Sequence, residues 1–292
     1  MKRLLSVIII LGLCVSGCGR RESRHKLALL PEYRNSAEAN YNVGATLASN
    51  EKYEEALPYL KRSLELDPNY FKAYNALGLI EARKDKMQEA AAYFLKAIKI
   101  SDEYPDAHYN LGICMLHLGN AERGLSELQR TVELDPHYPA ALFALASQYN
   151  RTGQKELAQK YYEASLKEEP DNPQALLSLG WIYYEKNAIS QAIDRIKLAL
   201  QYAPDYAEAY FRLGSIYQYQ NINAKAEELY LKAIEKDPRL KDAYLNLADL
   251  YANDNKAEKA KYYYKAALAL DSSNQYVQKK LEQLKTVKES NP

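Results

Sequence analysis

The chain has 292 residues, of which 47% are hydrophobic and 26% are charged, and its formal net charge is +1. This near-neutral balance excludes a strong overall field that would attract nucleic acid or an acidic substrate. Three cysteines, Cys14, Cys18 and Cys114, are too few for a disulfide framework, and no Cys/His spacing typical of a zinc site occurs. Stability must therefore come from packing, and 27 tyrosines against 4 phenylalanines suit helices that bury amphipathic rings.

Residues 1–17 have the pattern of a signal peptide. Lys2 and Arg3 precede an apolar run over 4–15, which is about half of the roughly 20 residues that a membrane-spanning helix needs. The end of the run, Val15-Ser16-Gly17-Cys18, resembles the lipobox of bacterial lipoproteins, in which the cysteine after the cleavage site becomes lipidated. The resemblance implies an acyl (palmitate) anchor on Cys18. An ordinary secretory peptide with an incidental cysteine is the alternative.

The same resemblance predicts where the protein lies. Gly19, rather than aspartate, follows the cysteine, which favours delivery to an outer membrane, with the protein facing the periplasm. Residues 18–36 are then the lipidated cysteine and a polar tether. The alternative for the tether is that its basic residues touch anionic headgroups, each contributing about 1 kcal/mol near such a surface.

A small residue recurs every 34 residues along most of the chain, which indicates one structural unit copied seven times. The recurring residues are Gly44, Gly78, Gly112, Ala146, Gly180, Gly214 and Ala248. A second small residue follows each of them: Ala56, Ala90, Gly124, Ala158, Ala192, Ala226 and Ala260. Five of the copies then close with a proline: Pro68, Pro136, Pro170, Pro204 and Pro238.

These landmarks resemble those of the tetratricopeptide repeat (TPR) family, in which two antiparallel helices form each repeat. The resemblance covers residues 37–274 and implies an all-α fold, a right-handed superhelical solenoid of seven helix-turn-helix repeats. The repeats are expected at 37–70, 71–104, 105–138, 139–172, 173–206, 207–240 and 241–274. Residues 275–292 then form a capping helix and tail, with Val277, Leu281 and Leu284 on one face of the helix.

The physical chemistry of the residues agrees with this expectation. Apolar residues at helical spacing, such as Tyr210, Leu213 and Tyr217, give the first helix of a repeat a face for burial. A lone helical hairpin would leave that face wet, so the copies are expected to stack. Five turn residues are expected in the left-handed conformation, which glycine and asparagine tolerate. They are Gly119, Gly153, Asn187, Asn221 and Asn255.

Two repeats depart from the pattern. The second repeat has Glu81 in place of an aromatic residue and Ser101-Asp102 in place of proline, and the third has Gly124 in place of alanine. We expect the fold to be kept there but locally weaker, because glycine inside a helix costs about 1 kcal/mol relative to alanine.

The resemblance also predicts a binding groove, because in this family the first helices line the concave face. Carried over position by position, the candidate groove residues are Tyr41, Leu79, Arg83, Tyr109, Ile113, Leu116, His117, Phe143, Arg151, Leu177, Trp181, Tyr184, Phe211 and Tyr219. Most are apolar, and three successive basic residues beside them could hold a carboxylate or an acidic segment of a ligand. In the alternative, the rings pack on neighbouring helices and the basic row is a solvated rim.

Nothing in the sequence indicates an enzyme. No glycine-rich phosphate loop, HExxH or GxSxG element occurs, and His108 and His117 fall on opposite sides of one helix, so they cannot share a metal. We expect no catalytic residue, no metal and no cofactor. Cys114, between Ile113 and Met115, is expected to be a buried small hydrophobe.

The sequence thus predicts a non-catalytic scaffold, anchored by lipid to the bacterial envelope, that recruits other proteins or extended peptides and binds no nucleic acid. Assembly of an outer-membrane machine, such as a type IV pilus or secretion system, is the first hypothesis for its role. An adaptor that regulates a cell-wall enzyme or protease is the alternative, and a factor for polysaccharide export or glycan binding is a third. The oligomeric state stays open.

Overall fold

The computed structural model describes residues 35–289, and their side chains as far as residue 284. Over this range the chain forms fifteen helices and no strand. The predicted signal peptide, Cys18 and almost all of the tether lie outside the described residues. None of the described helices is both long and apolar enough to cross a membrane.

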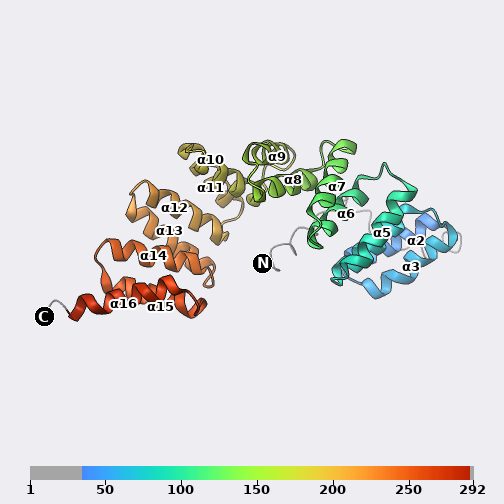
Figure 1. Ribbon diagram of the computed structural model, residues 1–292. Helices are drawn as coiled ribbons and strands as arrows, with labels where there is room; N and C mark the ends of the chain where they lie inside the picture. The colour runs from blue at the N-terminus through green and yellow to red at the C-terminus, as the bar shows by residue number, and fades with distance from the viewer. Residues whose placement is uncertain (1–34, 290–292) are drawn as a thin grey trace. The chain divides into compact units, whose positions relative to one another are not determined.

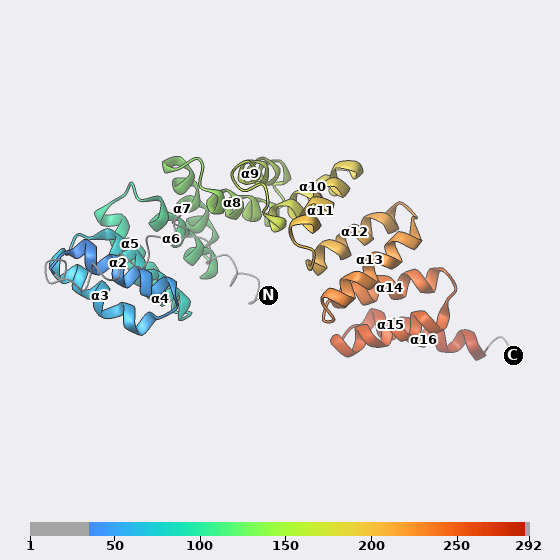
Figure 2. The ribbon, with the colours of Figure 1, turned by 180° about the vertical axis from the view of Figure 1, so that it is seen from behind.

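The chain divides into two compact units, unit 1 up to Glu168 and unit 2 from Glu169. The helices of unit 1 are α2 (Ala37–Ser49), α3 (Tyr53–Leu66), α4 (Phe71–Arg83), α5 (Met87–Ile100), α6 (Pro105–His117), α7 (Ala121–Leu134), α8 (Pro139–Arg151) and α9 (Lys155–Glu168). Those of unit 2 are α10 (Pro173–Glu185), α11 (Ile189–Tyr202), α12 (Ala207–Tyr219), α13 (Asn223–Lys236), α14 (Lys241–Asn253), α15 (Ala257–Leu270) and α16 (Gln275–Glu289). Figures 1 and 2 show the successive helix pairs from two sides.

Within each unit the fold is a helical repeat solenoid. Each pair joins a helix of 13 residues to one of 14. The first helix of each pair starts 34 residues after the start of the first helix of the preceding pair. Proline stands at the start of α6, α8 and α10, where its missing N–H leaves no helical hydrogen bond unmade. The final helix, α16, packs on α15 and buries Val277 completely, while Leu281 and Leu284 are half-buried.

A left-handed residue lies in the turn of all seven pairs. The five glycine and asparagine residues expected there are confirmed, with φ between 56° and 83°. The first two turns use Glu51 and Asp85, both at φ 62°, which the sequence analysis did not single out. Aspartate tolerates this conformation as asparagine does, whereas glutamate rarely adopts it. The same backbone turn is therefore imposed by the packing of the two helices, whatever residue occupies it.

The recurring glycines mark the points where the two helices of a pair meet. A Cβ at Gly78 would lie 2.5 Å from the Phe94 ring, and one at Gly214 would lie 2.8 Å from the Tyr230 ring. Repeats four and seven place alanine at this point, opposite the buried rings of Tyr162 and Tyr264. The small residue of the first helix thus makes room for one large, fully buried side chain of the second.

Gly124 is accounted for by a compensating contact. A Cβ at this position would lie 2.7 Å from Cγ of Leu116 and 3.0 Å from the Gly112 carbonyl oxygen. Leu116 stands where the first two repeats have Ala48 and Ala82, so the space left by the glycine is filled by a larger side chain of the first helix. The packing of Leu116 therefore offsets the low helix propensity of Gly124.

This contact predicts that Gly124→Ala destabilises the protein, although alanine is the better helix former. Overpacking of this kind costs typically about 1–3 kcal/mol, and Leu116→Ala in the same chain should restore much of the loss. Thermal unfolding followed by circular dichroism, on both single variants and the double variant, measures the coupling. A Gly124→Ala protein that melts above the wild type would contradict the packing argument.

Candidate functional site

The first helices of unit 2 carry a connected row of aromatic side chains. The Trp181 and Tyr184 rings on α10 lie 4.7 Å apart between centroids, and the Tyr184 ring meets the Tyr219 ring on α12 edge-on at 5.6 Å. Tyr219 is 61% exposed, whereas Trp181 and Tyr184 are half-buried. We call Trp181, Tyr184, Arg212 and Tyr219 the aromatic face of unit 2.

Arg212 lies against this row and is held in two ways. Its guanidinium carbon is 4.2 Å from the centroid of the Trp181 ring, a close cation–π contact. Its Nε donates a hydrogen bond to Oε1 of Glu208, one turn earlier on α12, at 2.7 Å. Both charged side chains are about one-third exposed, so the guanidinium is fixed in orientation while part of it still faces solvent.

Buried side chains lie next to the face, and the Arg212 guanidinium carbon is 5.6 Å from the centroid of the Phe211 ring. Phe211 and Leu177 are buried, and the Phe211 ring lies 5.9 Å from the fully buried ring of Tyr230. The Tyr230 hydroxyl donates to Oε1 of Gln218 at 2.6 Å and accepts from Nδ2 of Asn246 at 3.3 Å. The hydrogen bonds of Tyr230 therefore join the three successive helices α12, α13 and α14.

Unit 1 carries a different arrangement, a cluster of tyrosines around one carboxylate. The Tyr138 hydroxyl donates to Oδ1 of Asp106 at 2.9 Å, and the Tyr138 ring lies 5.2 Å from that of Tyr109. Burial, followed by the nearby Tyr70 and Asp106, raises the pKa of Tyr41 to about 12. Burial and Asp106 likewise raise the pKa of Tyr138. These phenols stay protonated at neutral pH and serve as packing groups and hydrogen-bond donors.

A small pocket of unit 1 lies between α4, α5 and α6. It has a volume of about 10 Å³ and is lined by Leu79, Ala82, Phe94, Tyr109, Asn110, Ile113 and Cys114. That volume holds about one water-sized group, so it gives no room for a ligand side chain. Cys114 is buried, with its Sγ 3.9 Å from the Met87 sulfur, and burial raises its thiol pKa to about 12. This confirms the expectation that Cys114 is buried as a small hydrophobic residue.

The fourteen residues predicted to line the groove are placed in three different environments. Buried inside the packing, and 3–8% exposed, are Tyr109, Ile113, Leu177 and Phe211. Half-buried are Tyr41, Leu79, Leu116, Phe143, Trp181 and Tyr184. Exposed are Arg83, His117, Arg151 and Tyr219. For the four buried residues the alternative interpretation, packing on neighbouring helices, describes the structure, and they offer little area to a partner.

The predicted basic row has a local explanation as well. Arg83, His117 and Arg151 are the last residues of α4, α6 and α8, where a cation is stabilised by the helix dipole. The Nε of Arg151 also donates to Oε1 of Gln148 at 2.7 Å. The cation that meets the aromatic face is instead Arg212, which sequence reasoning missed. A signal was present, since repeat six has Arg212 where three other repeats have asparagine, with Glu208 four residues before it.

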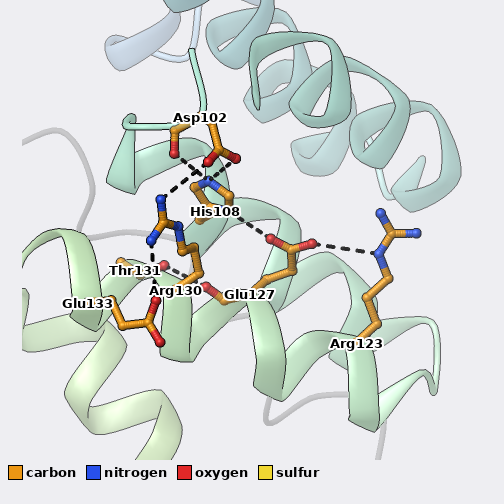
Figure 3. Close-up of polar contacts among 7 residues, drawn as sticks. All are labelled: Asp102, His108, Arg123, Glu127, Arg130, Thr131 and Glu133. Carbon is orange, nitrogen blue, oxygen red and sulfur yellow. Dashed lines mark hydrogen bonds and ion pairs between the residues drawn. The ribbon is translucent and has the colours of Figure 1, made fainter. Parts of the chain in front are cut away.

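A buried histidine holds the junction between the second and third repeats, where proline is replaced by Ser101-Asp102 (Figure 3). His108 on α6 places Nδ1 2.7 Å from Oε2 of Glu127 and Nε2 3.0 Å from the Asp102 carbonyl oxygen. Arg130 reaches an Asp102 carboxylate oxygen at 3.2 Å. The junction that the sequence marked as atypical is thus tied to α7 by a polar network.

The geometry favours the charged form of His108. A carboxylate and a carbonyl oxygen both accept hydrogen bonds, and both ring nitrogens donate only in the imidazolium. Burial alone would lower the pKa of His108, but the bonds to Glu127 and to the Asp102 carbonyl, with the two carboxylate charges, raise it. Arg123, 3.7 Å from Glu127, and Arg130 are the cations that face these carboxylates.

The raised pKa gives a pH dependence of stability. The contribution of His108 is fully present below its unfolded pKa of about 6.5 and is lost as the pH rises through the higher folded value. We expect His108→Gln to destabilise the protein by about 1–3 kcal/mol at pH 6, because it removes a buried donor, and by less at pH 9. Melting of both proteins across this range tests it, and a constant difference would show that His108 does not titrate there. The difference between the wild type and His108→Gln removes the contributions of other titrating groups. One of these is the exposed His137, whose pKa is also raised, by Glu168.

The fold and these faces define the class: a helical repeat protein with polar and aromatic side chains gathered on its first helices. Models described as tetratricopeptide repeat match residues 41–106, 81–149, 149–214, 207–240 and 229–262, which together span 41–262. The chain belongs to the tetratricopeptide repeat family. No curated protein sequence matches it.

Several solved structures share the fold. A crystal structure of YrrB, described as a TPR protein with an unusual peptide-binding site, is 27% identical, covers 65% of this chain and 96% of its own, and has a TM-score of 0.50. PilF of Pseudomonas aeruginosa is 18% identical over 75% of this chain and 94% of its own, with a TM-score of 0.64. The Cut9–Hcn1 hetero-tetramer of APC/C is 16% identical over 90% of this chain, with a TM-score of 0.63. This chain spans 58% of the length of that one.

Across residues 35–284 no group of three or more His, Cys, Asp or Glu side chains could hold a metal ion. TPR solenoids are in general modules that bind proteins or peptides.

Proposed function

We propose that this protein is a non-catalytic scaffold that binds an extended peptide or protein segment on its first helices, with the aromatic face of unit 2 as the principal contact. The observation that carries the proposal is Arg212 fixed between Trp181 and Glu208, beside the exposed ring of Tyr219. Membership of the TPR family supports it, as does the likeness to YrrB, a TPR protein with a peptide-binding site.

The chemistry of the face suits binding rather than stability alone. Trp, Tyr and Arg are the residue types that most often dominate binding energy at interfaces. Here Arg212 is held against Trp181 and bonded to Glu208, so little conformational entropy of these side chains is lost when a partner covers them. A 61% exposed tyrosine is also a large ring that the fold leaves in water.

The proposal has a cellular part that rests on the sequence. A lipid on Cys18 would hold the repeats at the bacterial envelope, where the bound segment would belong to an outer-membrane machine such as a type IV pilus or secretion system. The likeness to PilF shows a common fold. At 18% sequence identity it does not assign this protein to a pathway.

Affinity capture from envelope extracts tests the binding surface. We expect partners retained by the wild type to be lost from a Trp181→Ala, Tyr219→Ala variant, since truncating such anchors commonly costs about 2 kcal/mol or more of binding. Tyr202→Ala is the matched control, because Tyr202 is 50% exposed at the end of a second helix, α11. Each variant must first show a wild-type helical spectrum. Equal capture by all three proteins would move the interface away from the aromatic face.

Replacement of Cys18 tests the anchor separately. In cells that carry Cys18→Ser, the protein should leave the membrane pellet and lose palmitate labelling, because no acyl chain can be attached. Cys14→Ser is the control, as it lies within the apolar run and should keep both properties. A Cys18→Ser protein that still pellets with membranes and carries label would show that the lipobox interpretation is wrong.

A further inference from the structure

We infer that Arg212 is the receptor for a carboxylate of the bound segment, an Asp or Glu side chain that lies next to an aromatic or aliphatic residue. The inference rests on the proposed function and names the chemistry of the ligand. It differs from the basic row expected from the sequence, whose members lie at helix ends in unit 1.

The geometry leaves one edge of the guanidinium available. Its Nε is bonded to Glu208 and one face is covered by Trp181. Among residues 35–284 the hydrogen-bond and ion-pair partner of Arg212 is Glu208, which it contacts through Nε, and the side chain is 35% exposed. The two Nη groups lie on the other edge of the guanidinium. These two donors form the fork that a carboxylate matches with two parallel hydrogen bonds.

The local charge selects among anions. Glu208 already neutralises part of the Arg212 charge at 2.7 Å, so a second group meets a site with little net positive charge. A dianionic phosphate would be repelled by Glu208, and no second cation in contact with Arg212 offsets that repulsion within the described residues. A singly charged, planar carboxylate fits both the charge and the plane of a guanidinium that is already held against an indole ring.

The rings beside Arg212 indicate what accompanies the carboxylate. From Trp181 the aromatic row continues through Tyr184 to the exposed ring of Tyr219. A residue neighbouring the carboxylate would lie along this row, where an aromatic or aliphatic side chain removes apolar surface from water. The occupant is therefore an acidic residue with an apolar neighbour, in a segment extended enough to reach both.

In the experiment, random heptapeptides displayed on phage are selected for binding to the purified full-length chain. The peptides that are eluted by competition are then synthesised. Each synthetic peptide is paired with an analogue in which Asp becomes Asn, or Glu becomes Gln. Binding is followed by the fluorescence of Trp181, the one tryptophan of the chain, which lies in the site. We expect the selected peptides to carry an acidic residue beside an apolar one, and the amide analogues to bind at least tenfold more weakly.

Variants assign the effect to Arg212. Arg212→Gln should bind the acidic peptides at least tenfold more weakly than the wild type does, and with the same affinity as their amide analogues. Arg212→Lys should recover only part of the difference, because lysine keeps the charge but loses the fork. Arg239→Gln, an exposed arginine of unit 2 before α14, makes the same change of charge and should leave binding unchanged. All variants are checked for a wild-type helical spectrum.

The outcomes separate the inference from the proposed function. The binding of a labelled peptide to Trp181→Ala and Tyr219→Ala is followed by anisotropy. If either of these variants binds the peptide more weakly but Arg212→Gln does not, the carboxylate inference fails and the binding face stands. If the amide analogues bind as well as the acids, the inference fails in the same way. If no selected peptide is weakened by any change in the aromatic face, both are overturned.

Discussion

The structure depends on the close approach of two helices at one small residue per repeat. At Gly44, Gly78, Gly112, Gly180 and Gly214 any Cβ would meet the partner helix within 3 Å. The absence of a side chain there lets the second helix insert a single large residue, such as Phe94 or Tyr230, which is then fully buried. The left-handed turn residue follows from the same packing, because the second helix must reverse direction within a few residues.

Departures from the repeat pattern are repaired by local contacts rather than tolerated as defects. Gly124 leaves room that Leu116 fills from the facing helix. The junction without proline is closed by His108, whose two ring nitrogens link Glu127 to the Asp102 carbonyl. Gly124 and Leu116 lie on the two helices of the third repeat, whereas Asp102 lies at the end of the second repeat and His108 and Glu127 lie in the third. In both cases the unusual residue is understood only together with the side chain that compensates for it.

The packing also decides which side chains are left for recognition. Along the first helices most large residues are used to join neighbouring repeats, as the burial of Tyr109, Ile113, Leu177 and Phe211 shows. In unit 2 the side chains that keep some exposure include an arginine fixed against a tryptophan and the exposed ring of Tyr219. Unit 1 has neutral phenols around Asp106 instead, so the two units offer different surfaces on equivalent helices.

The sequence by itself determined the helical repeat, its 34-residue period, the start of the capping helix and five of the seven left-handed turns, because these follow from local rules of spacing and backbone freedom. Only the tertiary structure decided that Glu51 and Asp85 adopt the same turn, that four predicted groove residues are buried, and that Arg212 is the cation on the aromatic face. Helical spacing gives the face of a helix on which a residue lies. How far that face is covered depends on the neighbouring repeats, whose side chains come from residues 30 or more positions away.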